Sequence, residues 1–317
     1  MTLSPPQPPS LLALLSGDGR PLIAVCGLIL LFAGAFALFV AARGDFLPHD
    51  IAFLGMAPQE LCAVHGCRVV HFMVHDRVAF GGALIAIGVV YLWLVAGPMD
   101  RGERWALEVL AASGVVGFAS FLAYLGYGYL DNWHGAATTI LAPLFVSGLV
   151  LTWRRVAWVR DDRRWLARPE WLASWPERHC VGRGLLLFAA AGMLGGGLTI
   201  LTVGMTCVFV PEDVAYLGVG RSELDALNPR LVPLIAHDRA GFGGAVCCCG
   251  VLLAGVVWRA ELDRAARQAL AVAGVAGFGT AILVHPAIGY TDWFHLAPAV
   301  GGAAVFTLGW WLTRARR

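Results

Sequence analysis

Three polar motifs occur twice in this chain, in the same order and at a nearly constant spacing. The pairs are Pro48-x-Asp50 with Pro211-x-Asp213, His75-Asp76-Arg77 with His237-Asp238-Arg239, and Gly128-Tyr129-x-Asp131 with Gly289-Tyr290-x-Asp292. The copies are separated by 163, 162 and 161 residues, respectively. Similarity at one fixed period indicates a duplicated structural unit. The fold therefore has to place two copies of the same His, Asp and Arg residues.

The sequence between these motifs is too apolar for a soluble domain. Hydrophobic residues make up 58% of the chain and charged residues 14%, whereas about 25% of residues are charged in soluble domains. A run of about 20 apolar residues crosses a bilayer as a helix. Eight such runs are present, and they cover 22–42, 78–97, 105–127, 135–153, 184–206, 240–258, 268–288 and 296–313. The second and sixth helices are expected to begin one turn earlier, at the His-Asp-Arg triplets.

These runs predict an all-α polytopic membrane protein with eight transmembrane helices. The repeated motifs divide it into two tandem four-helix repeats. Because four is an even number, both copies have the same orientation and are related by a pseudo-twofold axis along the membrane normal. The predicted segments are an N-terminal tail (1–20), repeat one (21–153), an amphipathic linker rich in Trp and Arg (154–183) and repeat two (184–317).

The arginines predict the orientation. All 23 basic residues are arginines, and 17 of them fall in the inner segments if the N-terminus is inside. The positive-inside rule then places both termini and the linker in the cytoplasm. The absence of Lys and the abundance of Arg, Gly and Ala are typical of a GC-rich bacterial genome, so we expect a bacterial inner membrane. The lipid bilayer is the expected partner, and no basic surface points to nucleic acid.

Histidines are concentrated on the predicted periplasmic side. His75 and His237 begin the second helix of each repeat, and His134 and His295 begin the fourth. Facing helices are expected to pair His75 with His134 and His237 with His295. Neutral imidazole is a ligand for haem iron and for copper or zinc. These four histidines are the predicted cofactor or metal ligands, and His71 is a further predicted cofactor-binding residue.

Charged residues beside the histidines form the second group of candidates. They are Asp76, Arg77, Asp131, Asp238, Arg239 and Asp292. A carboxylate would fix a histidine tautomer, and an arginine would bind a haem propionate, a quinone or a lipid phosphate. We treat these six as candidate catalytic residues. The alternative is that they form a polar clasp between helices.

Two further features bear on the site. Asp50 and Asp213 are expected to cap short surface helices over 50–64 and 213–227, with a role as charge partners of the histidines as the alternative. His285 precedes Pro286 only in repeat two, where the proline would kink the seventh helix and aim His285 inward.

Cys62 and Cys67 lie five residues apart in the first outer loop, and repeat two has no counterpart. An oxidising compartment favours a disulfide between them. The pair either stabilises the loop as a structural disulfide, or it is redox-active or handles a metal.

This plan resembles the haem A synthase family. That family has eight helices in two four-helix halves, histidines on the outer side of the second, fourth, sixth and eighth helices, and a Cys pair in the first outer loop. The matching positions here are His75, His134, His237 and His295, with Cys62 and Cys67. The resemblance covers the whole chain as architecture and implies a haem-binding relative.

The first functional hypothesis is therefore an integral redox protein that binds haem, or copper as the alternative, between outer-side His pairs. It would be a membrane oxidoreductase acting on a quinone or a small outer-side substrate. A second hypothesis is a proton- or anion-coupled permease or sensor. A third is a non-catalytic assembly protein that acts as a subunit of a membrane complex.

Overall fold

The computed structural model describes residues 17–63, 65–122, 129, 132–157, 166 and 168–314, and every regular element in these ranges is a helix. The eight long helices are α2 (Arg20–Ala42), α5 (Arg68–Ala96), α6 (Arg104–Leu122), α7 (Asn132–Arg155), α8 (Arg178–Met205), α11 (Leu231–Arg259), α12 (Arg264–Ile288) and α13 (Trp293–Leu312). Each predicted apolar run overlaps one of these helices. The prediction of an all-α protein is confirmed.

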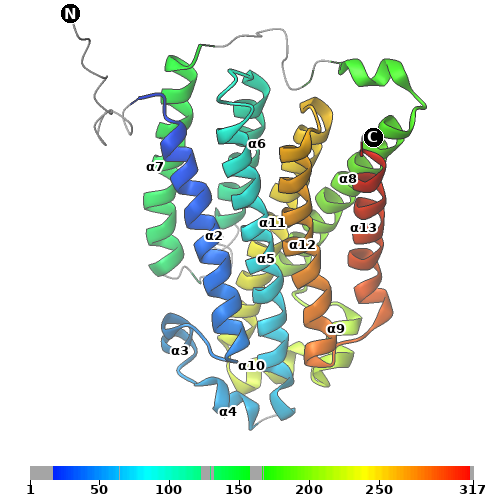
Figure 1. Ribbon diagram of the computed structural model, residues 1–317. Coiled ribbons are helices and arrows are strands. Elements are labelled where there is room, and N and C mark those ends of the chain that lie inside the picture. The colour runs from blue at the N-terminus through cyan, green and yellow to red at the C-terminus, as the bar shows by residue number, and fades with distance from the viewer. Residues whose placement is uncertain are drawn as a thin grey trace, which may run out of the picture.

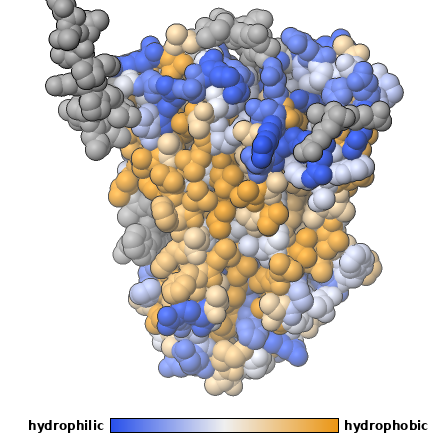
Figure 2. All heavy atoms as spheres, viewed as in Figure 1, coloured by the Kyte–Doolittle hydropathy of each residue, from blue (hydrophilic) through white to orange (hydrophobic). Residues whose placement is uncertain are grey.

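Five of these helices, α2, α5, α8, α11 and α12, are long and apolar enough to cross a membrane. Figure 2 shows a hydrophobic band around the middle of the visible face, with hydrophilic residues at both ends. Helices satisfy their own backbone hydrogen bonds, which is what the hydrocarbon core of a bilayer requires. The chain is thus a membrane protein with five candidate spans.

The helices α5 and α11 begin earlier than the sequence predicted. They start at Arg68 and Leu231, six or seven residues before His75 and His237, which is about two helical turns. The two histidines therefore lie inside the helices and not at their first residues. The helix continues through the charged triplets because ion pairs within the bundle compensate the buried charges, as described below.

The long helices pack as a closed ring whose main contact across the middle joins α5 and α11. Along the ring, the order is α2, α5, α12, α13, α8, α11, α6 and α7, and α7 returns to α2 (Figure 1). The helices α5 and α11 also contact each other across the ring. The third helix of each half thus packs mainly on the second helix of the other half. The halves are interlocked and do not form two separate bundles.

Small residues allow the closest helix contacts. A Cβ atom built on Gly34 of α2 would clash with the backbone of Gly81 in α5, and one on Gly197 of α8 would clash with the backbone of Gly243 in α11. Such close approach is typical of helix packing in membranes.

The Sγ atoms of Cys247, Cys248 and Cys249 on α11 face carbonyl oxygens of three different helices, α8, α6 and α5.

Four short helices lie together at one end of the bundle, which we call the short-helix end (Figure 1). They are α3 (Pro48–Leu54), α4 (Pro58–Cys62), α9 (Pro211–Leu217) and α10 (Arg221–Leu227). The two continuous helices predicted over 50–64 and 213–227 are therefore wrong. Each is split by a glycine, Gly55 or Gly218, whose positive φ of 66° or 72° ends the first helix.

We call the opposite end the termini end, because α2 begins and α13 ends there (Figure 1).

Candidate metal centre

A buried ion-pair group joins the two halves at the short-helix end. Arg77 of α5 donates from Nε to Asp238 Oδ2 of α11 over 2.9 Å, and its Nη1 lies 2.7 Å from Asp50 Oδ2 of α3. The Tyr129 hydroxyl donates to the other Asp50 oxygen over 3.1 Å. One arginine therefore bridges an aspartate of its own half and one of the other half.

The same group recurs with the halves exchanged. Arg239 of α11 donates from Nε to Asp76 Oδ2 of α5 over 3.3 Å and from Nη1 to Asp213 Oδ2 of α9 over 2.7 Å. The Tyr290 hydroxyl donates to Asp213 Oδ1 over 2.8 Å. Arg239 also donates to the carbonyl oxygen of Val208. Each arginine thus has two carboxylate partners and each of these two tyrosines donates to one aspartate.

These contacts support the alternative prediction for the charged residues, a polar clasp between helices. Asp76, Arg77, Asp238 and Arg239 hold α5 and α11 together through compensated charges, in a region where an unpaired charge would be costly. Asp50 and Asp213 cap their short helices as expected, because each accepts a hydrogen bond from the backbone at the start of its helix, at Leu47 and Val210. The charge partners described above are arginines, whereas the sequence suggested histidines.

Three histidines meet beside the second of these groups. His75 of α5, His285 near the end of α12 and His295 in the first turn of α13 each offer a ring nitrogen, and the three atoms lie within 4.8 Å of one another. His75 and His285 are buried, at 3% and 4% exposure, and His295 is half-buried. We call these three residues the His cluster.

The tautomers of two members follow from their neighbours. His285 Nδ1 lies 2.7 Å from the carbonyl oxygen of Ala281. A carbonyl only accepts hydrogen bonds, so this Nδ1 carries the proton and Nε2 has the lone pair. His75 Nδ1 lies 3.1 Å from Asp76 Oδ1. That carboxylate favours the same tautomer, and Asp76 thereby connects His75 to Arg239.

His295 is held by backbone and side-chain contacts. Asp292 caps α13 by accepting from the His295 backbone nitrogen over 2.9 Å, and His295 Nδ1 lies 3.8 Å from Asp213 Oδ1. The ring of Tyr290 stacks on that of His295, with centroids 4.5 Å apart. Burial and the Asp213 carboxylate raise the pKa of Tyr290 above its ordinary value, so this phenol stays neutral.

Aromatic rings enclose the His cluster. Phe72 lies 6.1 Å from His75 and 6.3 Å from Tyr290 between ring centroids, and Tyr216 stacks on Tyr290 at 4.5 Å. A dry apolar surrounding strengthens both metal coordination and electrostatic contacts. The polar atoms at this site are the imidazole nitrogens and the carboxylate oxygens of Asp76 and Asp213 beside them.

The grouping of histidines differs from the expected pairs. His295 of the second half faces His75 of the first, whereas His237 lies beside Tyr129, with ring centroids 4.9 Å apart, and beside Asp238. The interlocked ring of helices causes this exchange, because α12 packs on α5. His71 is exposed, one turn before His75. The His134 side chain and Asp131 lie outside the described residues.

His285 was not among the ligands predicted from the sequence, although Pro286 was expected to aim this residue inward. Residues that occur in both halves were given more weight, and the His285-Pro286 pair occurs only in the second half. His285 nevertheless makes the shortest ring contact in the His cluster, with the His75 ring centroid 4.5 Å away.

Cys62 and Cys67 form a disulfide next to α5.

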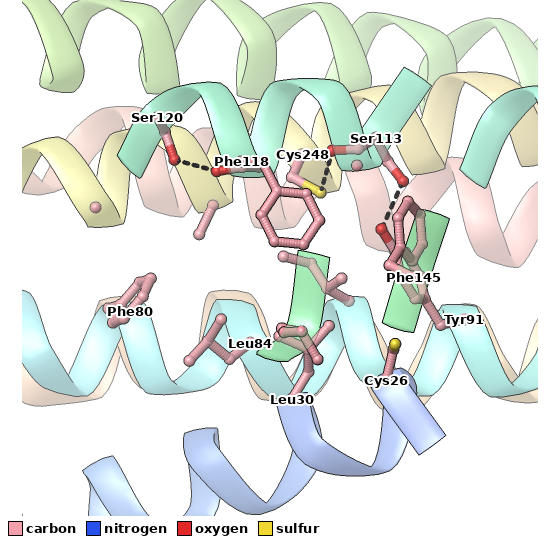
Figure 3. A pocket seen from close by; sticks show the side chains of 16 residues that line it. Cys26, Leu30, Phe80, Leu84, Tyr91, Ser113, Phe118, Ser120, Phe145 and Cys248 are labelled. Carbon is pink, nitrogen blue, oxygen red and sulfur yellow. Dashed lines mark hydrogen bonds between the residues drawn. The ribbon is translucent and has the colours of Figure 1, made fainter. Parts of the chain in front are cut away.

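A separate cavity of about 80 Å³ lies between α2, α5, α6, α7 and α11. Figure 3 shows Phe80, Leu84, Phe118 and Phe145 around it, with Tyr91 and Ser113 joined by a hydrogen bond of 2.9 Å. Its lining contains no histidine or charged residue. Cys26 and Cys248 line this cavity, which is distinct from the His cluster.

No family model, curated protein or solved structure matches the chain. The resemblance to haem A synthase stays an expectation based on architecture.

Proposed function

We propose that this chain is an integral membrane metalloprotein that binds one first-row transition-metal ion on His75, His285 and His295 and uses it in redox chemistry. The observation that carries the proposal is the distance of 3.1 Å between His75 Nε2 and His285 Nε2. His285 Nδ1 donates to the Ala281 carbonyl, so the lone pair of His285 Nε2 points at His75 Nε2 in a buried space. A contact this short needs either a proton on His75 Nε2 or a cation shared by both nitrogens.

The distance fits two ligands of one ion. Metal–imidazole bonds of about 2.0–2.1 Å in tetrahedral directions place two nitrogens about 3.3 Å apart. Axial histidines on opposite faces of a haem iron would lie about 4 Å apart, which is twice such a bond. The His cluster therefore favours a metal ion over the haem expected from the sequence. Haem stays a prediction that an absorption spectrum tests.

The donor set indicates which ions fit. Imidazole nitrogen suits zinc, copper, iron and nickel, and copper(II) binds most tightly among the divalent ions of this series. Copper is the redox-active ion we favour, as in the alternative reached from the sequence. Three protein ligands leave a coordination position for a small molecule. A bound copper ion would supply one-electron chemistry, while Asp76 and the Ala281 carbonyl orient His75 and His285.

The proposal includes a topology of eight spans in two tandem repeats with a pseudo-twofold axis along the membrane normal. The recurrence of the Arg–Asp–Tyr group with the halves exchanged supports it. So do matching contacts around the ring, such as α2 with α5 and α8 with α11. We place both termini in the cytoplasm of a bacterial inner membrane and the His cluster on the periplasmic side, where a disulfide is stable.

The experiment is purification of the full chain in detergent after expression with copper, zinc or iron, followed by metal analysis and absorption spectroscopy. We expect about one metal ion per chain and no Soret band. The double variant His75→Ala/His285→Ala should lose the ion, and the exposed His71→Ala should keep it. A Soret band that disappears in the double variant would establish haem instead. Metal-free protein would contradict the proposal.

A further inference from the structure

A large basic cavity lies at the termini end, remote from the His cluster. Its volume is about 1220 Å³, and it is bounded by the first turns of α8 and α12 and the last turn of α13. The arginines that line it are Arg178, Arg183, Arg264, Arg267 and Arg314. Glu177 and Asp263 are its acidic residues, and the Asp263 carboxylate caps α12 by accepting from the Ala266 backbone nitrogen.

These arginines lack carboxylate partners. Within the described ranges, none of the five forms a salt bridge. The buried Arg267 Nε has no hydrogen-bond partner there, and the Arg183 guanidinium donates only to the carbonyl oxygens of Val257 and Ala260. The cavity therefore carries an excess of positive charge, with five arginines against the two acidic residues Glu177 and Asp263.

In the first half of the chain, the arginine that corresponds to Arg264 is paired with a carboxylate. Arg104 aligns with Arg264 at an offset of 160 residues, the offset that also relates Gly114 to Gly274. Arg104 Nε lies 3.2 Å from Glu108 Oε1, one turn along α6. The residue that follows Arg264 by the same four positions is Gln268, which is uncharged. The arginine thus pairs with a carboxylate one turn later in the first copy, whereas an uncharged glutamine stands at that position in the second copy.

The same difference appears at the start of the first helix of each half. Arg20 pairs with Asp18 and Asp100. Its counterpart Arg183, at an offset of 163 residues, has Val181 in place of Asp18. Both differences remove negative charge from the second half only.

The rim of the cavity has the composition of a lipid interface. The Arg178 guanidinium lies over the Trp311 ring, 4.3 Å from its centroid, and those of Arg267 and Arg314 lie over Trp310. Leu262 and Leu312 also line the cavity. Trp and Arg together are typical of the headgroup layer of membrane proteins, and basic pockets between helices bind anionic headgroups there.

We propose that this cavity binds the phosphate of an anionic phospholipid headgroup, through Arg178, Arg264, Arg267 and Arg314. Two helix N-termini, those of α8 and α12, add their positive ends to the same space. The inference goes beyond the metal centre and does not depend on it. A soluble phosphate has the same chemistry, so the experiment distinguishes the two sources.

The test measures binding to the purified full chain in detergent, by native mass spectrometry for lipids and by calorimetry for pyrophosphate. The lipids are dioleoylphosphatidylglycerol and dioleoylphosphatidylcholine. The variants are Arg264→Gln/Arg267→Gln and Gln268→Glu, which gives Arg264 the partner that Arg104 has. The matched control is Arg101→Gln, an arginine at the same end that already pairs with Glu103.

We expect phosphatidylglycerol to bind in preference to phosphatidylcholine. The double variant should weaken this binding about 25-fold, because each arginine near an anionic lipid is worth roughly a factor of five. Gln268→Glu should weaken it about fivefold and keep the fold, since it is an exposed helical position. Arg101→Gln should have no effect.

Pyrophosphate that binds with the same dependence on Arg264 and Arg267 would support the phosphate site and identify a soluble ligand. Equal binding of the two lipids without pyrophosphate binding would overturn the inference. Equal loss in the double variant and in Arg101→Gln would also overturn it.

Discussion

His75 and His285 are 210 residues apart in the sequence, yet their Nε2 atoms lie 3.1 Å apart in the bundle. The contact joins α5 of the first half to α12 of the second. It exists because the third helix of each half packs on the second helix of the other. The proposed metal site therefore takes its ligands from both halves of the chain.

His285→Ala should lower the affinity for the metal ion more than any change outside the His cluster. It removes a ligand whose tautomer is fixed by the Ala281 carbonyl. Competition with a chromogenic chelator measures the affinity. Equal affinity of His285→Ala and the wild type would contradict this assignment.

Asp76→Asn should lower metal affinity by about 10–100-fold, as changes of residues that orient a ligand do. The matched control is Asp238→Asn. Both aspartates bridge an arginine of α5 or α11 and a histidine, but only Asp76 contacts a member of the His cluster. Both variants should therefore lose comparable stability, and only Asp76→Asn should change the chelator titration. A similar affinity loss in both would assign Asp76 a structural role only.

The pair Arg77–Asp238 should show strong energetic coupling. Removing one partner of a buried pair leaves a buried charge and costs about 3–5 kcal/mol. Alanine variants in a double-mutant cycle, measured as free energies of unfolding in SDS, should give a coupling of about 1–3 kcal/mol. Arg43–Asp45 is an exposed pair in the same protein, and its coupling should be below about 1 kcal/mol. Equal coupling in the two cycles would refute the clasp.

Gly197→Ala should destabilise the bundle by about 1–3 kcal/mol, because the added methyl group meets the backbone of α11. Gly192 lies on the same helix, and a Cβ there would meet nothing within 4 Å. Gly192→Ala should be neutral or stabilising by up to about 1 kcal/mol, since alanine favours helix more than glycine does. The two melting temperatures in detergent give the comparison, and a shift of the same sign in both would be inconsistent with this packing.

Tyr290→Phe should cost about 1.5–3 kcal/mol, the range for a hydrogen bond to a charged group. The raised pKa of Tyr290 has a pH consequence. The unfolded chain loses this proton near pH 10, whereas the folded protein keeps it to higher pH. Its contribution to stability is complete below about pH 10 and is lost as the pH rises further. Unfolding measured from pH 8 to 11 should show a steeper decline in the wild type than in Tyr290→Phe, and parallel curves would exclude this contribution.

The helical class of the fold was predictable from the long apolar runs. The polar residues that meet at the short-helix end were predictable from the repeated motifs. Both are local features of the sequence. Arg77 and its counterpart were selected as candidate catalytic residues with a polar clasp as the alternative, and Asp50 and its counterpart as helix caps with a charge-partner role as the alternative. The pairing between halves was not predictable. It depends on which helix packs on α5, and periodicity says nothing about that choice.

His285 shows the same limit for the site. Comparison of the copies gives weight to residues that recur, and His285 has no counterpart in the first half. His285 reaches His75 because α12 of the second half packs on α5 of the first half. The start of α5 was also misplaced, because a charged triplet was expected to begin the helix, whereas in the structure its charges are paired inside the bundle.

X-ray absorption at the metal K-edge of the copper-loaded, full-length protein tests the metal centre most directly. We expect about three nitrogen ligands at about 2.0 Å, with the multiple-scattering pattern of imidazole. In His285→Ala, one imidazole should be missing from the fit. A shell of oxygen ligands alone, or a spectrum unchanged by His285→Ala, would contradict a metal site on the His cluster.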